Sequence, residues 1–278
     1  MKEKIILVFK GMILGIANII PGVSGGTLAI SLGIYKKIIK TISHFFKKFK
    51  ENLVFVGCLG IGMLLSVVLL SKGIAYALEH HTLITKLFFI GLILGGTPLI
   101  YKKVKEKFSV SNILVFLLTF GLVLGMTLLR SGEVVVNLTN MNIIEYVILF
   151  LVGVIAAGTM IIPGISGSFV LMMLGYYYPI LTRINDLTSF NNIFSNLITL
   201  GIFGIGVLVG IVLVAKLIEF LLKKYEIKTY YGILGFVLAS IPCILIQKPS
   251  FVLSPSSVLI GLILCFIGGF ISYKLGEK

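Results

Sequence analysis

Several residue types are scarce in this 278-residue sequence. It has no tryptophan, three cysteines and ten acidic residues, and only 12% of its residues are charged. Soluble domains carry about 25% charged and 45–50% apolar residues, whereas this chain is 58% hydrophobic with a mean hydropathy of +1.13. One buried core does not need so much apolar sequence. The composition therefore predicts an all-α polytopic membrane protein.

The few cysteines and acids exclude further classes of site. Cys58, Cys243 and Cys265 lie in apolar segments and show no paired or ligand-like spacing, so we expect neither a disulfide framework nor a metal site. No acidic residue lies in the middle of an apolar span, which argues against a carboxylate proton relay. No segment resembles a P-loop, and we expect no ATP or other cofactor.

The chain is strongly basic, with 24 Lys+Arg against 10 Asp+Glu and a net charge of +14. The basic residues form short clusters between apolar stretches. They therefore predict membrane orientation and contact with anionic membrane lipids rather than a nucleic-acid partner. Segment 34–50 places Ile34, Ile38, Ile42, Phe45 and Phe49 on one helical face, and predicts an amphipathic helix on the cytoplasmic leaflet.

Two long apolar stretches, 5–35 and 143–180, are interrupted by PGVSGG (21–26) and PGISGS (163–168). Because proline and glycine interrupt helices, each stretch predicts two half-helices joined by irregular backbone. Such backbone persists at membrane depth only where protein or a water-filled cavity shields it. Six uninterrupted stretches are long enough to span a bilayer: 53–71, 83–100, 111–129, 193–215, 230–247 and 255–273.

The two interrupted stretches are copies of each other. Aligned at Pro21 and Pro163, they share Pro, Gly, Ser, Gly, Leu, Gly, Tyr and Ile, and a second echo relates Pro98 to Pro242. The sequence therefore predicts a tandem duplication, with a first repeat at 1–135 and a second at 136–278. Three full spans in each repeat would invert the second repeat relative to the first, as in many secondary transporters.

The distribution of basic residues favours re-entrant hairpins at 5–35 and 143–180. If both turn back and both termini are cytoplasmic, five of the 24 basic residues lie outside: Lys72, Lys86, Arg130, Arg183 and Lys248. If both stretches cross, the basic residues divide evenly between the two sides of the membrane, which contradicts the positive-inside rule. We therefore expect six transmembrane helices plus two re-entrant helical hairpins that enter from opposite faces, with tips that approach one another.

The hairpin tips are the candidate site for an anionic group. Hydroxyls, and glycines that let backbone N–H groups approach a ligand, precede a half-helix whose first N–H groups are unpaired. The alternative is that these small residues only allow tight packing. Small residues elsewhere, at Gly91, Gly95, Gly206 and Gly210, predict close helix packing. The candidate phosphate-binding residues are Asn18, Ser24, Gly25, Gly26, Thr27, Ser166, Gly167 and Ser168, with Arg130 and Arg183 as candidate cations.

The strings GIANIIPGVSGGTLAISLGIY and IIPGISGSFVLMMLGYY resemble the polyprenyl-phosphate transporter family, and the resemblance extends over essentially the whole chain. It implies a lipid-phosphate flippase in the bacterial plasma membrane. Such a protein moves undecaprenyl phosphate from the outer to the inner leaflet, which recycles the carrier lipid of cell-envelope synthesis. Asn18 departs from the family pattern, in which many relatives have Asp. This difference argues against proton uptake at this position.

The chain is also distantly similar to undecaprenyl pyrophosphate phosphatases of the bacitracin-resistance type. Those enzymes carry paired glutamates before the first loop and an arginine in the second, whereas this chain has GMILGIAN before Pro21 and Gly167 in place of the arginine. Hydrolysis needs a base and a cation for the transition-state charge. We therefore expect no catalytic residues and no enzyme. Architecture alone also supports a small-anion secondary transporter.

Overall fold

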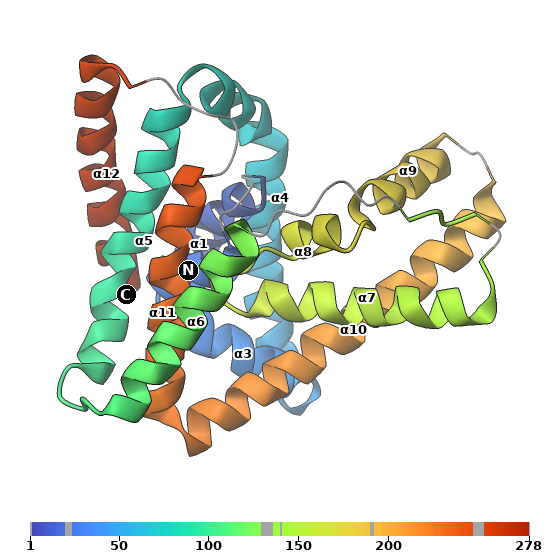
Figure 1. The fold of residues 1–278 in the computed structure, drawn as a ribbon, viewed down its shortest axis with the longest axis horizontal. Coiled ribbons are helices and arrows are strands. Elements are labelled where there is room, and N and C mark those ends of the chain that lie inside the picture. The colour runs from blue at the N-terminus through green and yellow to red at the C-terminus, as the bar shows by residue number, and fades with distance from the viewer. Residues whose placement is uncertain are drawn as a thin grey trace.

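The computed structural model describes residues 2–19, 24–128, 136–139, 141–189, 192–246 and 253–277, and these residues form helices without strands (Figure 1). The first half contains α1 (Lys2–Ile19), α2 (Gly25–Ser31), α3 (Tyr35–Ser43), the 3-10 helix η1 (Phe45–Lys48), α4 (Phe49–His80), α5 (Thr82–Val104) and α6 (Val110–Leu128). The second half contains α7 (Ile143–Ile161), α8 (Gly167–Met173), α9 (Tyr177–Thr188), α10 (Ile193–Lys224), α11 (Glu226–Ile246) and α12 (Pro255–Gly276).

The two halves repeat the same order of elements. Helices α2 and α8 have seven residues each, and α4 and α10 have 32 each. Helices α5 and α11 each contain one proline, Pro98 and Pro242. This order agrees with a duplicated sequence, while the inverted orientation of the second half stays a prediction.

The long helices pack in pairs through glycines. Helix α4 packs along α1, and α10 packs along α7. Gly206 of α10 lies against the carbonyl of Phe150, and Gly210 lies against that of Val154. A Cβ at either glycine would overlap the facing backbone, so only glycine permits this approach. The prediction of close packing at these glycines is confirmed.

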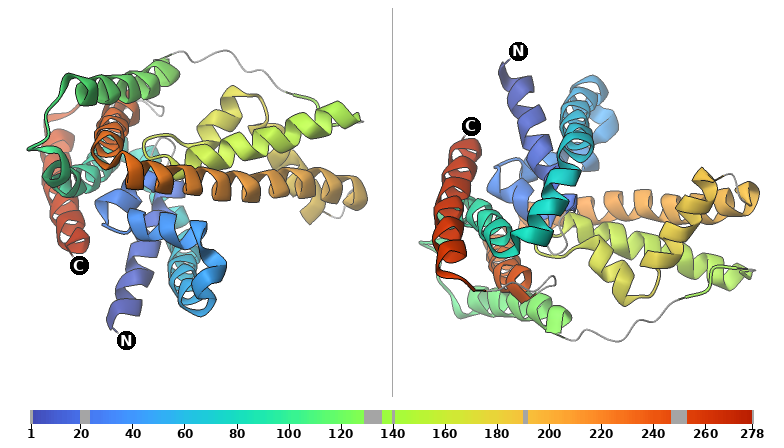
Figure 2. Two further views of the ribbon diagram at one scale, coloured as in Figure 1. Left: turned by 90° about the horizontal axis from the view of Figure 1, so that it is seen from below. Right: turned by 90° about the horizontal axis from the view of Figure 1, so that it is seen from above.

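The last helix of each half packs against the other half. Helix α12 lies along α5, where Gly91 contacts the Cys265 carbonyl and Gly95 contacts the Gly269 carbonyl. Helix α6 lies along α11. The halves are therefore interlocked, with Ala17, Leu28, Ile93 and Val237 among the fully buried core residues. Figure 2 shows α7 and α10 projecting together away from this bundle, and both chain ends on one side of the molecule.

Seven helical segments in the described residues are long and apolar enough to cross a membrane, and the chain is a multi-pass membrane protein. Six of them correspond to the six expected spans. The seventh is α7 (Ile143–Ile161), which the sequence assigned to the second re-entrant hairpin. Because α7 has 19 residues, it is long enough to cross by itself. Its turning back within the membrane stays a prediction.

The arms that follow the two interruptions are each split into two short helices. Gly33 has φ +70 between α2 and α3, and Gly175 has φ +79 between α8 and α9, a backbone region that glycine adopts readily. The amphipathic helix expected at 34–50 is shorter than predicted, because α3 covers only Tyr35–Ser43 and η1 follows it. Helix α3 ends at Ser43 because the amide of Asn52 donates hydrogen bonds to the carbonyls of His44 and Phe45, at 3.1 and 2.9 Å, and stabilises a turn there.

Candidate functional site

The second interruption, residues 162–168, is called the second tip here. Helix α7 begins with a capping box between Asn142 and Glu145 and ends just before Pro163. A residue before proline avoids the helical region, and Ile162 is extended with φ −74 and ψ 124. Gly164 has φ +80, and extended Ser166 leads into α8. The predicted break in this stretch is therefore confirmed.

Residues 24–27 form the described part of the first tip. Ser24 is extended with φ −91 and ψ 128, closely matching Ser166 with φ −97 and ψ 124. Ser24 is only 2% exposed, and its hydroxyl has no hydrogen-bond partner among the described residues. An unpaired buried polar group costs about 1–3 kcal/mol, so it is a natural place for a ligand. Residues 20–23 and the candidate side chain of Asn18 lie outside the described part of the chain.

The two tips are in direct contact. The backbone N–H of Gly164 donates to Thr27 Oγ1 at 2.7 Å, and Tyr35 Oη donates to the Ile161 carbonyl at 3.1 Å. Gly26 faces the same segment, where an added Cβ would lie 3.2 Å from the Ile161 carbonyl oxygen. The structure thus joins segments more than a hundred residues apart at the point where both apolar stretches are interrupted.

Residues of the two tips line separate cavities. Gly25 and Gly26 line a cavity of about 310 Å³, called the tip groove, whose other walls come from α1, α3, α4, α7 and α10. Gly164 and Ser166 line a pocket of about 20 Å³, called the serine pocket, together with Thr127 and Cys243. The Thr27–Gly164 hydrogen bond links the segments that line these two cavities.

The remaining candidates of the second tip have partners within the protein. The hydroxyls of Ser166 and Ser168 lie 2.8 Å apart and share a hydrogen bond. A Cβ on Gly167 would lie 2.7 Å from the Ala156 carbonyl oxygen. Glycine at this position is therefore needed for α8 to pack against α7.

The structure does not bring the candidate arginine on α9 to the tips. Arg183 is 9% exposed and donates to Asn196 Oδ1 at 2.8 Å and to the carbonyl of Leu138. It lines neither the tip groove nor the serine pocket. Its contacts tie α9 to α10 and to the segment before α7, and Arg130 lies outside the described residues. In the described chain no cluster of three metal-ligating side chains occurs.

One buried cation close to the first tip was not proposed from the sequence. Lys10 is 4% exposed, and its Nζ donates to the Leu32 carbonyl at 2.8 Å, at the end of α2. Helix α2 lies between Leu32 and Ser24, so this contact of Lys10 is about 10 Å from Ser24. The position of Lys10 inside an apolar stretch was the available signal, because lysines are rare at such positions.

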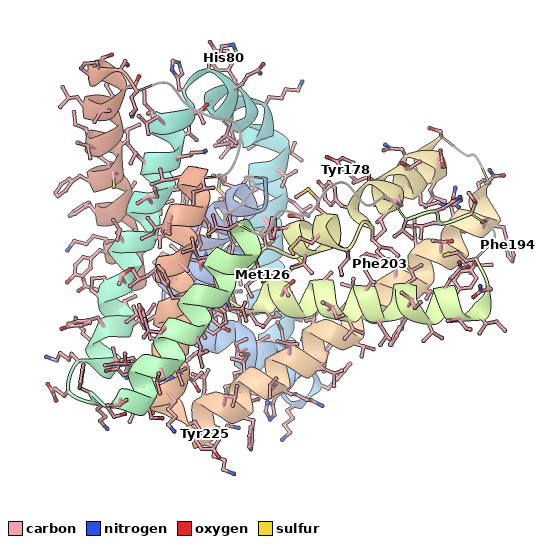
Figure 3. The ribbon with its side chains drawn as sticks, viewed as in Figure 1. His80, Met126, Tyr178, Phe194, Phe203 and Tyr225 are labelled. Atoms are coloured by element: carbon pink, nitrogen blue, oxygen red, sulfur yellow. The ribbon has the colours of Figure 1, made fainter. Side chains whose placement is uncertain are left out.

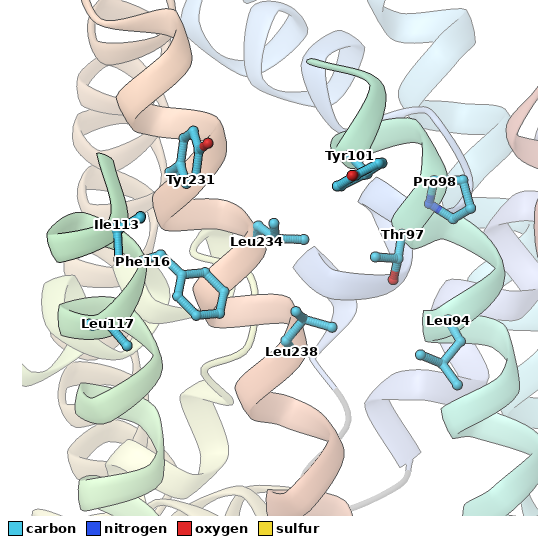
Figure 4. Close-up of a pocket in the computed structure, with 10 residues that line it drawn as sticks. All are labelled: Leu94, Thr97, Pro98, Tyr101, Ile113, Phe116, Leu117, Tyr231, Leu234 and Leu238. Carbon is cyan, nitrogen blue, oxygen red and sulfur yellow. The ribbon is translucent and has the colours of Figure 1, made fainter. Parts of the chain in front are cut away.

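Two further cavities are mainly apolar. The proline groove, about 480 Å³, runs between Ile162 and Pro163 at one end and Tyr225, Lys228 and Thr229 at the other. The tyrosine groove, about 700 Å³, lies between α5, α6 and α11, and neither tip contributes to it (Figure 4).

Comparisons with known proteins place these features in one family. A family described as undecaprenyl phosphate translocase-like matches residues 14–257. A protein named polyprenyl-phosphate transporter from Staphylococcus aureus (strain NCTC 8325 / PS 47) is 32% identical over 99% of this chain and 96% of the relative. A protein of the same name from Vibrio cholerae serotype O1 (strain ATCC 39315 / El Tor Inaba N16961) is 29% identical over 84% of this chain and 75% of the relative. No solved structure matches the chain. On the family match and the Staphylococcus aureus relative, the chain belongs to the undecaprenyl phosphate translocase-like family.

Proposed function

We propose that this protein transports polyprenyl phosphate, and that it moves undecaprenyl phosphate from the outer to the inner leaflet of the bacterial plasma membrane. The carrier lipid then returns to cell-envelope synthesis. The observation that carries the proposal is the buried hydroxyl of Ser24, which has no hydrogen-bond partner among the described residues and lies next to two glycines that line an apolar groove. A lipid phosphate needs this combination of polar donors and apolar walls.

The phosphate is held by hydrogen-bond donors at the tips. Burying an anion without donors is very costly, and charge-assisted hydrogen bonds are stronger than neutral ones. Ser24 supplies a hydroxyl, and Gly25 and Gly26 supply N–H groups that no Cβ shields. Helix α2 has only seven residues, so these individual donors matter more than a helix dipole. Ser166, Gly167 and Ser168 are the corresponding donors on the other side.

Transport requires the two tips to exchange partners. The Gly164 N–H is occupied by Thr27 Oγ1, so it becomes available to a phosphate only when this hydrogen bond opens. We infer that the phosphate passes from the serine-pocket side to the tip-groove side as the tips separate and close again. This step is the alternating access expected of two repeats that meet near the membrane midplane.

Contacts between loops support a shared cytoplasmic face for both termini. Lys36 Nζ and Glu226 Oε1 form an ion pair of 2.9 Å between the start of α3 and the start of α11. Gly33 lies against the Gly276 carbonyl, so the segment between α2 and α3 meets the end of α12. His80 lies between Lys72 and Lys86, which are expected outside, whereas Tyr225 follows lysines that are expected inside, and the two residues lie at opposite ends of the molecule in Figure 3.

The basic residues of this face favour anionic lipids. Each exposed lysine near such a surface contributes about 1 kcal/mol of attraction. Partial burial lowers the pKa of the Lys36 ammonium, but hydrogen bonds with Tyr230 and Glu226 and their charges outweigh it and raise that pKa overall. A raised pKa keeps Lys36 charged, and the ion pair is lost only as the pH rises through that value. Lys36 therefore stays positive at neutral pH.

Two other functions fit less well. A small-anion transporter needs a hydrated, polar path, whereas the tip groove is lined mainly by aliphatic and aromatic side chains. A phosphatase needs a general base and a cation at the phosphate. The described residues of the two tips contain no acidic or basic side chain.

Competition binding on purified protein separates these functions. We expect labelled undecaprenyl phosphate to bind and to be displaced by unlabelled undecaprenyl phosphate but not by a hundredfold excess of inorganic phosphate, and no inorganic phosphate to be released from undecaprenyl pyrophosphate. Equal displacement by inorganic phosphate would support the small-anion transporter, and steady release of phosphate would support the phosphatase. Absence of undecaprenyl phosphate binding would refute the proposal.

A further inference from the structure

The tip groove combines backbone of the first tip with apolar walls. Gly25 and Gly26 line it, and its walls include Phe55, Leu59 and Met63 of α4. The hydroxyl of Tyr35, which also borders it, already donates to the Ile161 carbonyl. Apolar cavities of this kind stay dry and accept apolar ligands.

The groove lies between two helices that do not pack along each other. Val56 and Gly60 of α4 border it on one side, and Ile211 of α10 borders it on another. Helix α4 packs on α1, however, and α10 packs on α7. Val56 is 41% exposed, and the outer faces of both helices carry exposed aliphatic side chains such as Leu64 and Leu208. Where it lies between α4 and α10, the border of the groove is therefore apolar and partly exposed.

We propose that the tip groove binds the phosphate-proximal isoprene units of the substrate, and that the rest of the chain leaves to the bilayer between α4 and α10. This inference rests on the proposed function, because it needs the phosphate at the first tip. A volume of about 310 Å³ admits a few isoprene units but not a long polyprenol chain. The walls thus recognise an isoprenoid next to a phosphate, whatever its full length.

The other two grooves lack this continuity with hydrogen-bond donors. The tyrosine groove contains no residue of either tip. The proline groove reaches the second tip at Ile162 and Pro163, but proline has no N–H, and the Ile162 N–H already bonds the Gly158 carbonyl at 3.3 Å. Of the tip, proline and tyrosine grooves, only the tip groove joins glycines of a tip to apolar walls.

Two glycines of α4 provide a matched test. An added Cβ at Gly60 or at Gly57 would meet no heavy atom within 4 Å, so both positions have room for a Cβ. Gly60 lines the tip groove, whereas Gly57 lines none of the four cavities. Replacing glycine inside a helix also favours the helical state. Gly60→Phe fills the groove, and Gly57→Phe is the control for the same change on the same helix.

The experiment measures binding of undecaprenyl phosphate and of the short analogue geranyl phosphate to both variants in detergent. We expect Gly60→Phe to weaken both by about tenfold or more, since it displaces several buried methylene-sized groups, and Gly57→Phe to stay within about twofold of wild type. Geranyl phosphate should displace undecaprenyl phosphate far better than methyl phosphate does, because the geranyl chain fills the groove. The smaller Gly60→Leu variant should give an intermediate loss and replaces Gly60→Phe if the latter fails to fold.

The outcomes separate the groove from the proposed function. If wild type binds undecaprenyl phosphate and the Gly60 and Gly57 variants bind it equally well, the groove assignment is wrong and the function stands. If methyl phosphate displaces undecaprenyl phosphate as well as geranyl phosphate does, the groove does not recognise the isoprenoid chain and the assignment is equally wrong. If wild type binds no polyprenyl phosphate, the proposed function itself fails.

Discussion

Thr27 Oγ1 accepts a hydrogen bond of 2.7 Å from the backbone N–H of Gly164, and this bond joins the two interrupted segments of the chain. In the repeat alignment with an offset of 142 residues, Thr27 corresponds to Phe169. Phenylalanine cannot accept such a bond, so the equivalent contact is absent from the other side. The two repeats are therefore chemically unequal at the point where they meet, and the bond holds the tips in one arrangement.

Thr27→Val should destabilise the protein, because it leaves the partly buried Gly164 N–H without its partner. We expect a loss of about 1–3 kcal/mol in the free energy of unfolding, measured by thermal unfolding in detergent. Thr27→Ser should retain the bond and most of the stability. Thr182→Val is a suitable control, because Thr182 is exposed and its hydroxyl donates to the Tyr178 carbonyl of its own helix. Equal effects of the Thr27 and Thr182 changes to valine would show that the inter-tip bond contributes nothing.

Ser24→Ala and Ser31→Ala should have opposite consequences. The Ser24 hydroxyl has no partner within the described protein, so its removal should leave stability unchanged or raised while weakening undecaprenyl phosphate binding by about 1–3 kcal/mol. The Ser31 hydroxyl donates to the carbonyls of Thr27, at 3.2 Å, and Ile93, at 3.4 Å. Ser31→Ala should therefore lower stability and leave affinity nearly unchanged. Paired unfolding and binding curves make the comparison, and unchanged affinity in Ser24→Ala would remove this hydroxyl from the site.

Arg183→Met should affect stability and not substrate affinity. The change deprives the Leu138 carbonyl and the Asn196 side chain of a charged donor, at an expected cost of about 1–3 kcal/mol. Undecaprenyl phosphate binding, normalised to folded protein, should remain within about twofold of wild type. A tenfold loss of affinity in well-folded protein would restore Arg183 as a phosphate ligand.

Labelling of single cysteines tests the orientation of the chain. In a variant whose three native cysteines are replaced by serine, Lys47→Cys, Thr139→Cys and Ser189→Cys place exposed thiols on the loops of interest. The proposed topology predicts that an impermeant reagent labels positions 139 and 189 in intact cells, and position 47 only after permeabilisation. Labelling at 47 in intact cells, or protection at both 139 and 189, contradicts the inverted repeat.

The helices and their interruptions were predictable from the sequence because they depend on local chemistry. Runs of apolar residues of sufficient length define the spans, and Pro163 forces the residue before it out of the helical region. Gly206 and Gly210 indicated close helix packing, because small residues four positions apart let another helix approach closely. These features need no knowledge of which segments meet.

The roles of individual polar residues depended on tertiary contacts and were harder to predict. Arg183 was a candidate cation, but its partners Asn196 and Leu138 are distant in sequence. Lys10 was counted only as a cytoplasmic charge, yet it is buried beside Leu32. Gly167 is predicted to admit a ligand, whereas in the structure its lack of a Cβ makes room for the backbone of Ala156. A valine at Gly167 is therefore expected to disturb packing as well as transport.

Leaflet exchange of undecaprenyl phosphate in proteoliposomes tests the central claim most directly. The comparison is between wild type, Gly25→Val at the first tip, and Gly121→Val on α6, where an added Cβ meets no heavy atom within 4 Å. We predict that wild type and Gly121→Val accelerate exchange over protein-free vesicles, and that Gly25→Val, monodisperse and folded, does not, because a branched Cβ keeps the phosphate from the backbone N–H groups. Exchange by folded Gly25→Val at the wild-type rate would show that the phosphate does not pass the first tip.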